Sequence, residues 1–176
     1  MSTTNTNKTG FRPHQGQDNG AIIVGEYRYL LWRTWDSAHP RLLWVLLNPS
    51  TADGQIDDPT LRRCIGFSRD WQYGGLEIVN LFALRSRQPR DLFTAADPVG
   101  SENDQYLAAA AARAQCIVLA WGTHGIYRQR DRAVLALLAR QSVQPFHCLG
   151  TTQHGHPRHP LYVAQTARPV PIPDQA

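Results

Sequence analysis

The fold class is indicated by residues 41–82, which read RLLWVLLNPSTADGQIDDPTLRRCIGFSRDWQYGGLEIVNLF. The segments 41–47 and 76–82 are continuous apolar runs of strand length, as expected for strands buried on both faces. Between them, Asp58-Pro59 suits the N-cap and first position of a helix, and apolar residues follow at helical spacing as far as Trp71. This strand–helix–strand unit predicts a parallel sheet covered by helices.

The same alternation continues toward the C-terminus. Residues 102–114 and 127–141 are expected to be helices, and residues 116–121 and 145–149 are expected to be strands. Residues 21–35 also resemble strand material, with Gly25 as a turn or a bulge. The pattern predicts a three-layer α/β domain with a central, mainly parallel sheet of four to five strands and helices on both faces.

Length and composition favour a single domain, which we place at residues 19–168 of the 176. Residues 1–18 are expected to form a disordered leader, and residues 169–176 a flexible tail. The apolar fraction is 42%, with no run long enough for a membrane span and no secretory signal, so we expect a cytoplasmic protein.

The three cysteines are scattered and show no CxxC spacing, which argues against a disulfide framework or a zinc site. We expect no metal and no cofactor. The net charge of +4 is carried almost entirely by arginine, because Lys8 is the sole lysine. Arginine suits phosphate binding and stacking on bases, so a nucleic-acid partner is one interpretation. A genome rich in GC codons would produce the same bias.

Ligands of parallel α/β sheets bind beyond the carboxyl ends of the strands, which directs attention to four loops. The first loop carries Asn48, Ser50 and Asp53 directly after a buried strand. An amide held there by the scaffold can position a water molecule or a base edge. The alternative is that these residues only satisfy the backbone groups of a turn.

The second and third loops supply further candidates. Asn80 is a polar residue inside an apolar strand, so it bridges neighbouring strands or faces a ligand. Phe82 could stack on a planar ring or belong to the core. Arg85 and Arg87 follow in a loop that could track a phosphate backbone or simply be solvated. Gly122 comes straight after a strand, where glycine allows close approach of a ligand.

The fourth loop gathers His154, His156, Arg158 and His159 within residues 150–162. Their spacing matches no metal site. A histidine held between prolines, His159 or His156, could instead act as an electrophile toward a substrate carbonyl or an anionic leaving group. The alternative is a set of surface histidines without a function. Arg158 is a third candidate for contact with DNA.

The motifs LLNPSTAD (46–53), DDPTLRR (57–63), IVNLFALR (78–85), LAWG (119–122) and GHPRHPLY (155–162) resemble those of an uncharacterised bacterial and phage family, a domain of unknown function. Their order is also remotely similar to the uracil-DNA-glycosylase superfamily. This similarity implies a glycosylase-like fold in which Asn48 positions the attacking water, Asn80 binds the base edge and the late histidine stabilises the departing base. The sequence departs from that superfamily because its His-Pro pairs do not copy the HPSPL spacing.

Three functions follow from these observations. The first is a DNA glycosylase-like N-glycosidase that recognises and excises a damaged or modified nucleobase without a cofactor. The second is a non-catalytic module that binds a nucleobase, a nucleotide or DNA. The third is a small hydrolase acting on another substrate with His159 as an acid, although no nucleophile elbow accompanies it.

Overall fold

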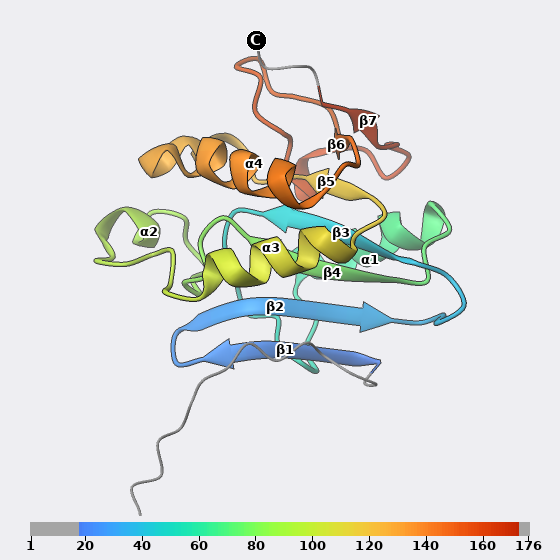
Figure 1. Ribbon diagram of the computed structural model, residues 1–176, viewed down its shortest axis with the longest axis horizontal. Coiled ribbons are helices and arrows are strands. Elements are labelled where there is room, and N and C mark those ends of the chain that lie inside the picture. The colour runs from blue at the N-terminus through green and yellow to red at the C-terminus, as the bar shows by residue number, and fades with distance from the viewer. Residues whose placement is uncertain (1–17, 173–176) are drawn as a thin grey trace, which may run out of the picture.

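The computed structural model describes residues 18–172, which form a mixed α/β fold around one sheet (Figure 1). Most of the expected leader therefore lies outside the described residues, as do positions 173–176 of the expected tail. The strands are β1 (Asn19–Val24), β2 (Tyr27–Thr34), β3 (Arg41–Leu46), β4 (Gly75–Asn80), β5 (Ile117–Leu119), β6 (Phe146–Cys148) and β7 (Val170–Pro171). The helices are α1 (Pro59–Asp70), α2 (Asp91–Thr94), α3 (Asn103–Arg113) and α4 (Arg130–Gln141), with 3-10 turns η1 (Thr123–Gln129) and η2 (Pro160–Tyr162).

The sheet has seven strands within residues 18–172, in the order β1-β2-β4-β3-β5-β6-β7. Neighbours among β4, β3, β5 and β6 are parallel, whereas β1, β2 and β7 join the sheet in antiparallel pairings. The four strands expected to be parallel neighbours are so, but the expected total of four to five strands was too low, and half of the strand pairings in the described residues are antiparallel. The expectation overlooked that the segment at 21–35 folds into a hairpin and adds two strands to one edge of the sheet, and that Val170–Pro171 adds one to the other.

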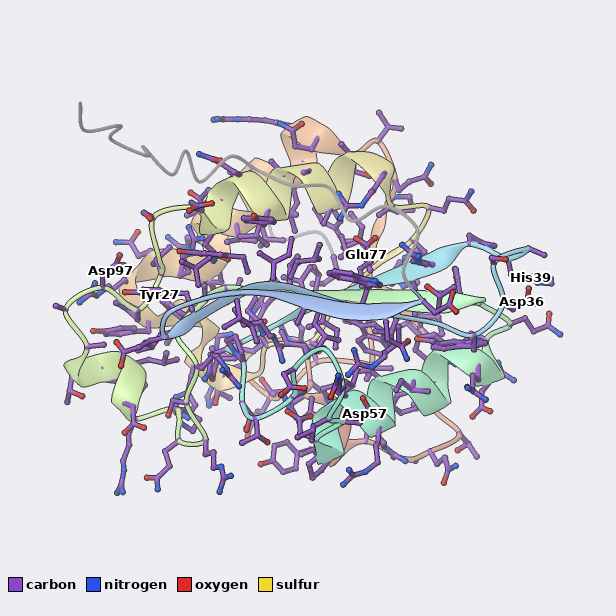
Figure 2. All side chains as sticks on the ribbon, turned by 90° about the horizontal axis from the view of Figure 1, so that it is seen from below. Tyr27, Asp36, His39, Asp57, Glu77 and Asp97 are labelled. Carbon is purple, nitrogen blue, oxygen red and sulfur yellow. The ribbon has the colours of Figure 1, made fainter. Side chains whose placement is uncertain are left out.

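Helices cover both faces of the sheet, as the alternation of elements predicts. Figures 1 and 2 show α3 and α4 on one face and α1 on the other. The side chains of β3 alternate accordingly, with Leu43 and Val45 in the core beneath α3 and α4, and Trp44 in the core beneath α1. The continuous apolar run at 41–47 is needed because both faces of this strand are buried.

Local sequence determines several element boundaries. Asp58 caps α1 with its side chain, and Pro59 occupies the first helical position, as expected. Gly25 has a φ of 57° and forms the turn between β1 and β2. The expected helix at 127–141 begins only at Arg130, because Arg128 and Gln129 adopt left-handed backbone angles that interrupt it. The loop at 83–101 contains the short helix α2.

The topology brings one unexpected segment to the carboxyl edge of the parallel strands. Because β2 runs antiparallel to β4, the start of β2 lies beside the end of β4. The bridge between Tyr27 and Leu84 confirms this placement. Arg28 therefore joins the loops that follow β3, β4, β5 and β6 at the same edge.

Candidate functional site

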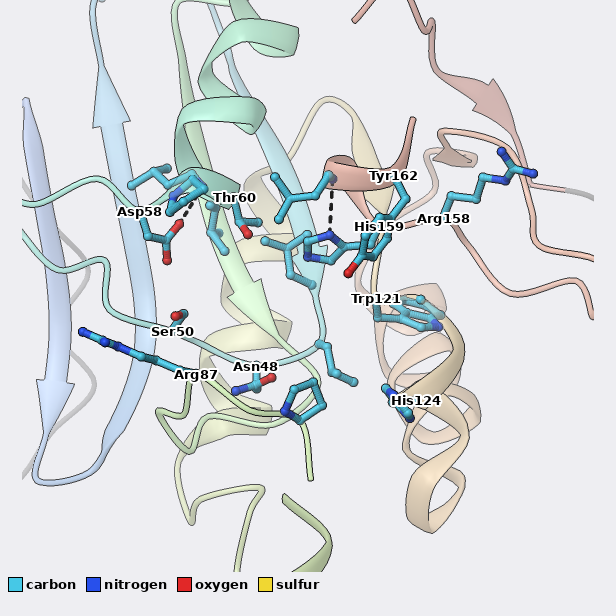
Figure 3. Close-up of a pocket in the computed structure, with 18 of the residues that line it drawn as sticks. Asn48, Ser50, Asp58, Thr60, Arg87, Trp121, His124, Arg158, His159 and Tyr162 are labelled. Atoms are coloured by element: carbon cyan, nitrogen blue, oxygen red, sulfur yellow. Dashed lines mark hydrogen bonds between the residues drawn. The ribbon is translucent and has the colours of Figure 1, made fainter. Parts of the chain in front are cut away.

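A cavity of about 760 Å³ lies at this edge, between the ends of the parallel strands and the first turn of α1. Its walls come from the loops after β3, β4 and β5 and from the long loop after β6 (Figure 3). The volume is in the range typical of small-molecule sites. The cavity therefore occupies the position where ligands bind in open parallel sheets.

Six of the residues singled out from the sequence line this cavity. They are Asn48, Ser50, Arg87, Gly122, Arg158 and His159. Figure 3 shows Asn48 and His159 on separate elements that border the same space. Residues more than a hundred positions apart are thus brought together, as the rule about carboxyl ends predicts.

His159 has a defined hydrogen-bonding role in this wall. Its Nδ1 accepts a hydrogen bond from the backbone N–H of Leu161 at 3.3 Å. Burial lowers the pKa of His159 below its ordinary value of 6.5, and the negative charge of Asp58 opposes this shift only in part. The imidazole is therefore neutral near pH 7 and, with Nδ1 used as an acceptor, carries its proton on Nε2.

Arg63, which the sequence reading did not single out, anchors the segment that carries His159. From α1 it donates from Nε to the carbonyl oxygen of Pro160 at 3.3 Å and from Nη2 to that of Val163 at 2.5 Å. Gly122 adds a second tie, because its N–H donates to the carbonyl oxygen of Pro157 at 2.8 Å. Its φ of 74° lies in the left-handed region, where glycine is favoured.

Asn48 ties two loops of the cavity together. Its Nδ2 donates to the carbonyl oxygens of Pro49 and Ser86, both at 3.0 Å. Within residues 18–172, nothing donates a hydrogen bond to its Oδ1. The amide thus has the turn-stabilising role considered as an alternative, and it also retains an acceptor at the cavity wall.

Arg28 lines the cavity, although its position in the sequence did not single it out. It is only 3% exposed. Its Nη1 donates to the carbonyl oxygen of Ala52 at 2.9 Å and its Nη2 to Oδ1 of Asn80 at 3.3 Å. Its Nε has no hydrogen-bond partner among the described residues. A charged residue within the apolar strand 27–34 was the available signal for this site.

Asn80 therefore does not line the cavity, contrary to its expected role in reading a base. It is 1% exposed and lies behind Arg28, whose guanidinium it holds. Its own carbonyl oxygen accepts a hydrogen bond from Asn103 Nδ2 at 3.0 Å. Of the side-chain amide, Oδ1 accepts from Arg28 across the neighbouring strands, as the bridging alternative describes, whereas the buried Nδ2 has no hydrogen-bond partner among the described residues.

Phe82 and Asp53 also lie away from the cavity lining. Phe82 is fully buried in the core beneath α3 and α4, where its ring lies 5.9 Å from that of Tyr127. Asp53 Oδ1 accepts from the backbone N–H groups of Gln55 and Ile56, both at 2.8 Å, which lowers the pKa of this carboxyl. The first residue packs the core and the second stabilises a turn.

Arg85 and His156 are likewise outside the cavity lining. The backbone N–H of Arg85 donates to the carbonyl oxygen of Glu26 at 2.9 Å, which holds the loop after β4 against the hairpin. The backbone N–H of His156 donates to Oγ1 of Thr152 at 3.2 Å within its own loop. Of the two candidate histidines, the structure brings only His159 to the cavity.

Residues 18–172 contain no group of three or more His, Cys, Asp or Glu side chains placed to hold a metal ion. Within the same residues, no helix combines the length and the apolar character that crossing a membrane requires. The cysteines Cys64, Cys116 and Cys148 are free thiols.

Comparisons with known proteins identify the family. Neither the curated proteins nor the solved structures contain a match to this chain. One family model matches residues 28–161, which begin at Arg28 in the cavity wall and end two residues after His159. The chain belongs to the family described as "Protein of unknown function (DUF1643)".

Proposed function

We propose that this protein binds an extrahelical nucleobase of DNA in the cavity at the carboxyl edge and hydrolyses its N-glycosidic bond. The observation that carries the proposal is the neutral His159, whose Nδ1 is occupied by Leu161 and whose remaining ring nitrogen carries the proton. It borders the same cavity as the unpaired Oδ1 of Asn48. Enzymes that act on a base within DNA extrude it into such a pocket.

The proposed reaction assigns one role to each of these two side chains. A water molecule that donates a hydrogen bond to Asn48 Oδ1 attacks C1′ of the sugar, and the bond from C1′ to the base nitrogen breaks. The bonding electrons leave with the base, which gains negative charge. The Nε2–H of His159 donates a hydrogen bond to that charge, and the base finally takes up the proton that the water releases.

The rim of the cavity supplies groups for the rest of the nucleic acid. Arg87 and Arg158 are exposed there, and Tyr162 is 80% exposed. Arg158 donates from its Nε to the carbonyl oxygen of Thr151 at 3.0 Å, and the ring of Tyr162 lies 5.6 Å from that of His159. Arginines at the rim suit backbone phosphates, and an exposed aromatic ring suits stacking on a base.

The similarity of motif order to the uracil-DNA-glycosylase superfamily supports the same proposal and extends it to a glycosylase-like fold. The similarity to this superfamily implies that Asn80 binds the base, and we propose a different role for Asn80. In the proposed function Asn80 holds Arg28, and the base meets Arg28 itself.

Cleavage of modified oligonucleotides tests this proposal. The panel contains uracil, hypoxanthine, oxidised and hypermodified bases, and alkaline treatment reveals any abasic site. We expect one class to be cut and His159→Ala to lower the rate by about a hundredfold or more, the scale of losing one such donor. His154→Ala is the matched control, because His154 is an exposed histidine of the same loop that does not line the cavity. If every oligonucleotide stays intact, the catalytic proposal is wrong.

The second candidate is a non-catalytic module that binds a nucleobase or nucleotide in the same cavity. It is favoured by the residue at position 48, since an amide cannot take a proton from water as a carboxylate can. In that case the cavity binds nucleosides without cleaving them, and His159→Ala lowers affinity while no abasic site forms in any sample.

A further inference from the structure

The floor of the cavity holds two buried, opposite charges that are not paired with each other. Arg28 is 3% exposed and Asp58 is 8% exposed, and both line the cavity. No ion pair within 4.0 Å joins Arg28 to a carboxylate in the described part of the chain. Buried charges are normally paired, because an isolated charge in a nonpolar environment is strongly unfavourable.

Other arginines show that this fold forms ion pairs elsewhere. Arg33, on the same strand as Arg28, contacts Asp57 at 2.8 Å. Arg113 contacts the buried Glu77 at 2.6 Å. Neither of these arginines lines the large cavity. Arg85 also has a buried Nε–H without a partner in residues 18–172, but it does not line the cavity. Arg28 differs from Arg85 in lining the cavity, where a ligand could supply the missing partner.

Both side chains retain hydrogen-bonding capacity. Arg28 uses one N–H of Nη1 for Ala52 and one N–H of Nη2 for Asn80, so a second N–H remains on each of these nitrogens. Its Nε–H has no partner in residues 18–172 and is shielded from solvent. Asp58 accepts from Leu61 N–H at 2.8 Å and, more weakly, from Ala52 N–H at 3.4 Å. A carboxylate can accept about four hydrogen bonds, so acceptor sites remain on Asp58. The floor therefore presents donors on Arg28 and acceptors on Asp58.

The balance of charge selects the kind of group that fits. A phosphate or carboxylate ligand would be attracted by Arg28 but repelled by Asp58. A neutral planar edge with a carbonyl oxygen beside an N–H satisfies both side chains at once. Asp58 influences Arg28 electrostatically, since it raises the pKa of Arg28 while burial, the larger effect, lowers that pKa to about 10.

We propose that Arg28 and Asp58 together bind the hydrogen-bonding edge of a lactam base such as uracil or hypoxanthine. Arg28 donates to the ring carbonyl oxygen, and Asp58 accepts from the neighbouring ring N–H. This inference rests on the proposed function of the cavity as a nucleobase site. It adds that the edge of the base must be unmethylated and that these two residues determine specificity.

Matched nucleosides test the edge directly on the unaltered, full-length protein. Isothermal titration calorimetry compares deoxyuridine with 3-methyldeoxyuridine, and deoxyinosine with 1-methyldeoxyinosine. Each methyl group removes the N–H that Asp58 is proposed to accept and adds the volume of a methyl group at the same edge. We expect methylation to weaken binding by about tenfold or more, the usual effect of losing a hydrogen bond to a charged group.

Variants then assign the preference to the two residues. Asp58→Asn keeps a side chain suited to the N-cap of α1, and it should reduce the difference between methylated and unmethylated nucleosides to about twofold or less. Arg28→Gln should weaken the binding of both nucleosides in each pair. Asp53→Asn is the control, because Asp53 belongs to the same loop but does not line the cavity. Near-UV circular dichroism checks that each variant is folded.

The outcomes separate this inference from the proposed function. If nucleosides bind but the methylated and unmethylated forms bind equally, Arg28 and Asp58 do not recognise the edge of the base, and the cavity is still a nucleobase site. If inorganic phosphate displaces the nucleosides and Arg28→Gln abolishes phosphate binding, the floor is an anion site and the inference is wrong. If no nucleoside binds and no oligonucleotide is cut, the proposed function fails and the inference fails with it.

Discussion

Replacing Asp58 with alanine should destabilise the protein through the start of α1. The carboxylate caps Leu61 N–H at 2.8 Å and also accepts from Ala52 N–H at 3.4 Å. Loss of an N-cap costs about 0.5–2 kcal/mol, and an orphaned buried donor adds to this. We expect a total loss of about 2 kcal/mol, which corresponds to a fall in Tm of about 4–8 °C for a chain of this size.

Urea unfolding followed by tryptophan fluorescence measures this loss, with Asp58→Asn and Asp70→Ala alongside. Asparagine retains the cap but removes the charge near Arg28, so it should lose about half as much stability as alanine. Asp70 is exposed on the same helix, and its alanine variant should stay within about 0.5 kcal/mol of the wild type. If Asp58→Ala changed stability no more than Asp70→Ala, the cap would not stabilise α1 as described.

The remaining predictions concern pH, salt and the first loop. The pKa of His159 is below 6.5 in the folded protein, so the unfolded chain takes up a proton at this residue first as the pH falls. The neutral His159 therefore contributes its full stabilisation above pH 6.5, and this contribution is lost as the pH falls below 6.5. Unfolding from about pH 7.5 to about pH 5.5 should therefore show a steeper loss for the wild type than for His159→Gln, and parallel curves would contradict the shift. Alanine at Arg87 or Arg158 should reduce the slope of log affinity for DNA against log salt concentration by about 0.7 to 0.9 each. Arg85→Ala should leave this slope nearly unchanged, because Arg85 does not line the cavity. Equal slopes for all three variants would show that Arg87 and Arg158 do not contact DNA. Asn48→Ala should slow cleavage more than it weakens nucleoside binding in single-turnover assays, and a loss confined to affinity would favour the binding module.

Local sequence was sufficient for the elements that depend on neighbouring residues. The cap at Asp58 and the turn at Gly25 each follow from the properties of one or two side chains. The apolar runs at 41–47 and 76–82 predicted buried neighbouring strands, because only strands covered on both faces are apolar throughout. The same rule predicted that Asn48, Asn80 and His159 would meet at one edge. Asn48 and His159 line one cavity, whereas Asn80 does not line it.

Tertiary structure alone decided which polar residues face that cavity. Asn80 and Arg28 are neighbours in space but 52 positions apart, and the sequence does not show that the guanidinium covers the amide. Phe82 packs in the core with residues of α3 and α4, although it follows the strand as closely as any site residue.

Arg28 shows the physical reason most clearly. It lies near the beginning of its strand, and a rule based on the carboxyl ends of parallel strands does not select such a position. The antiparallel pairing of β2 with β4 reverses the strand and carries its first residues to the same edge. Strand direction depends on long-range pairing between segments that are distant in the chain, and local periodicity is the same in either direction. The sequence by itself therefore determined the four parallel strands, most of the three long helices and the edge at which the loops meet. Only the folded chain placed the buried arginine in the wall of the site.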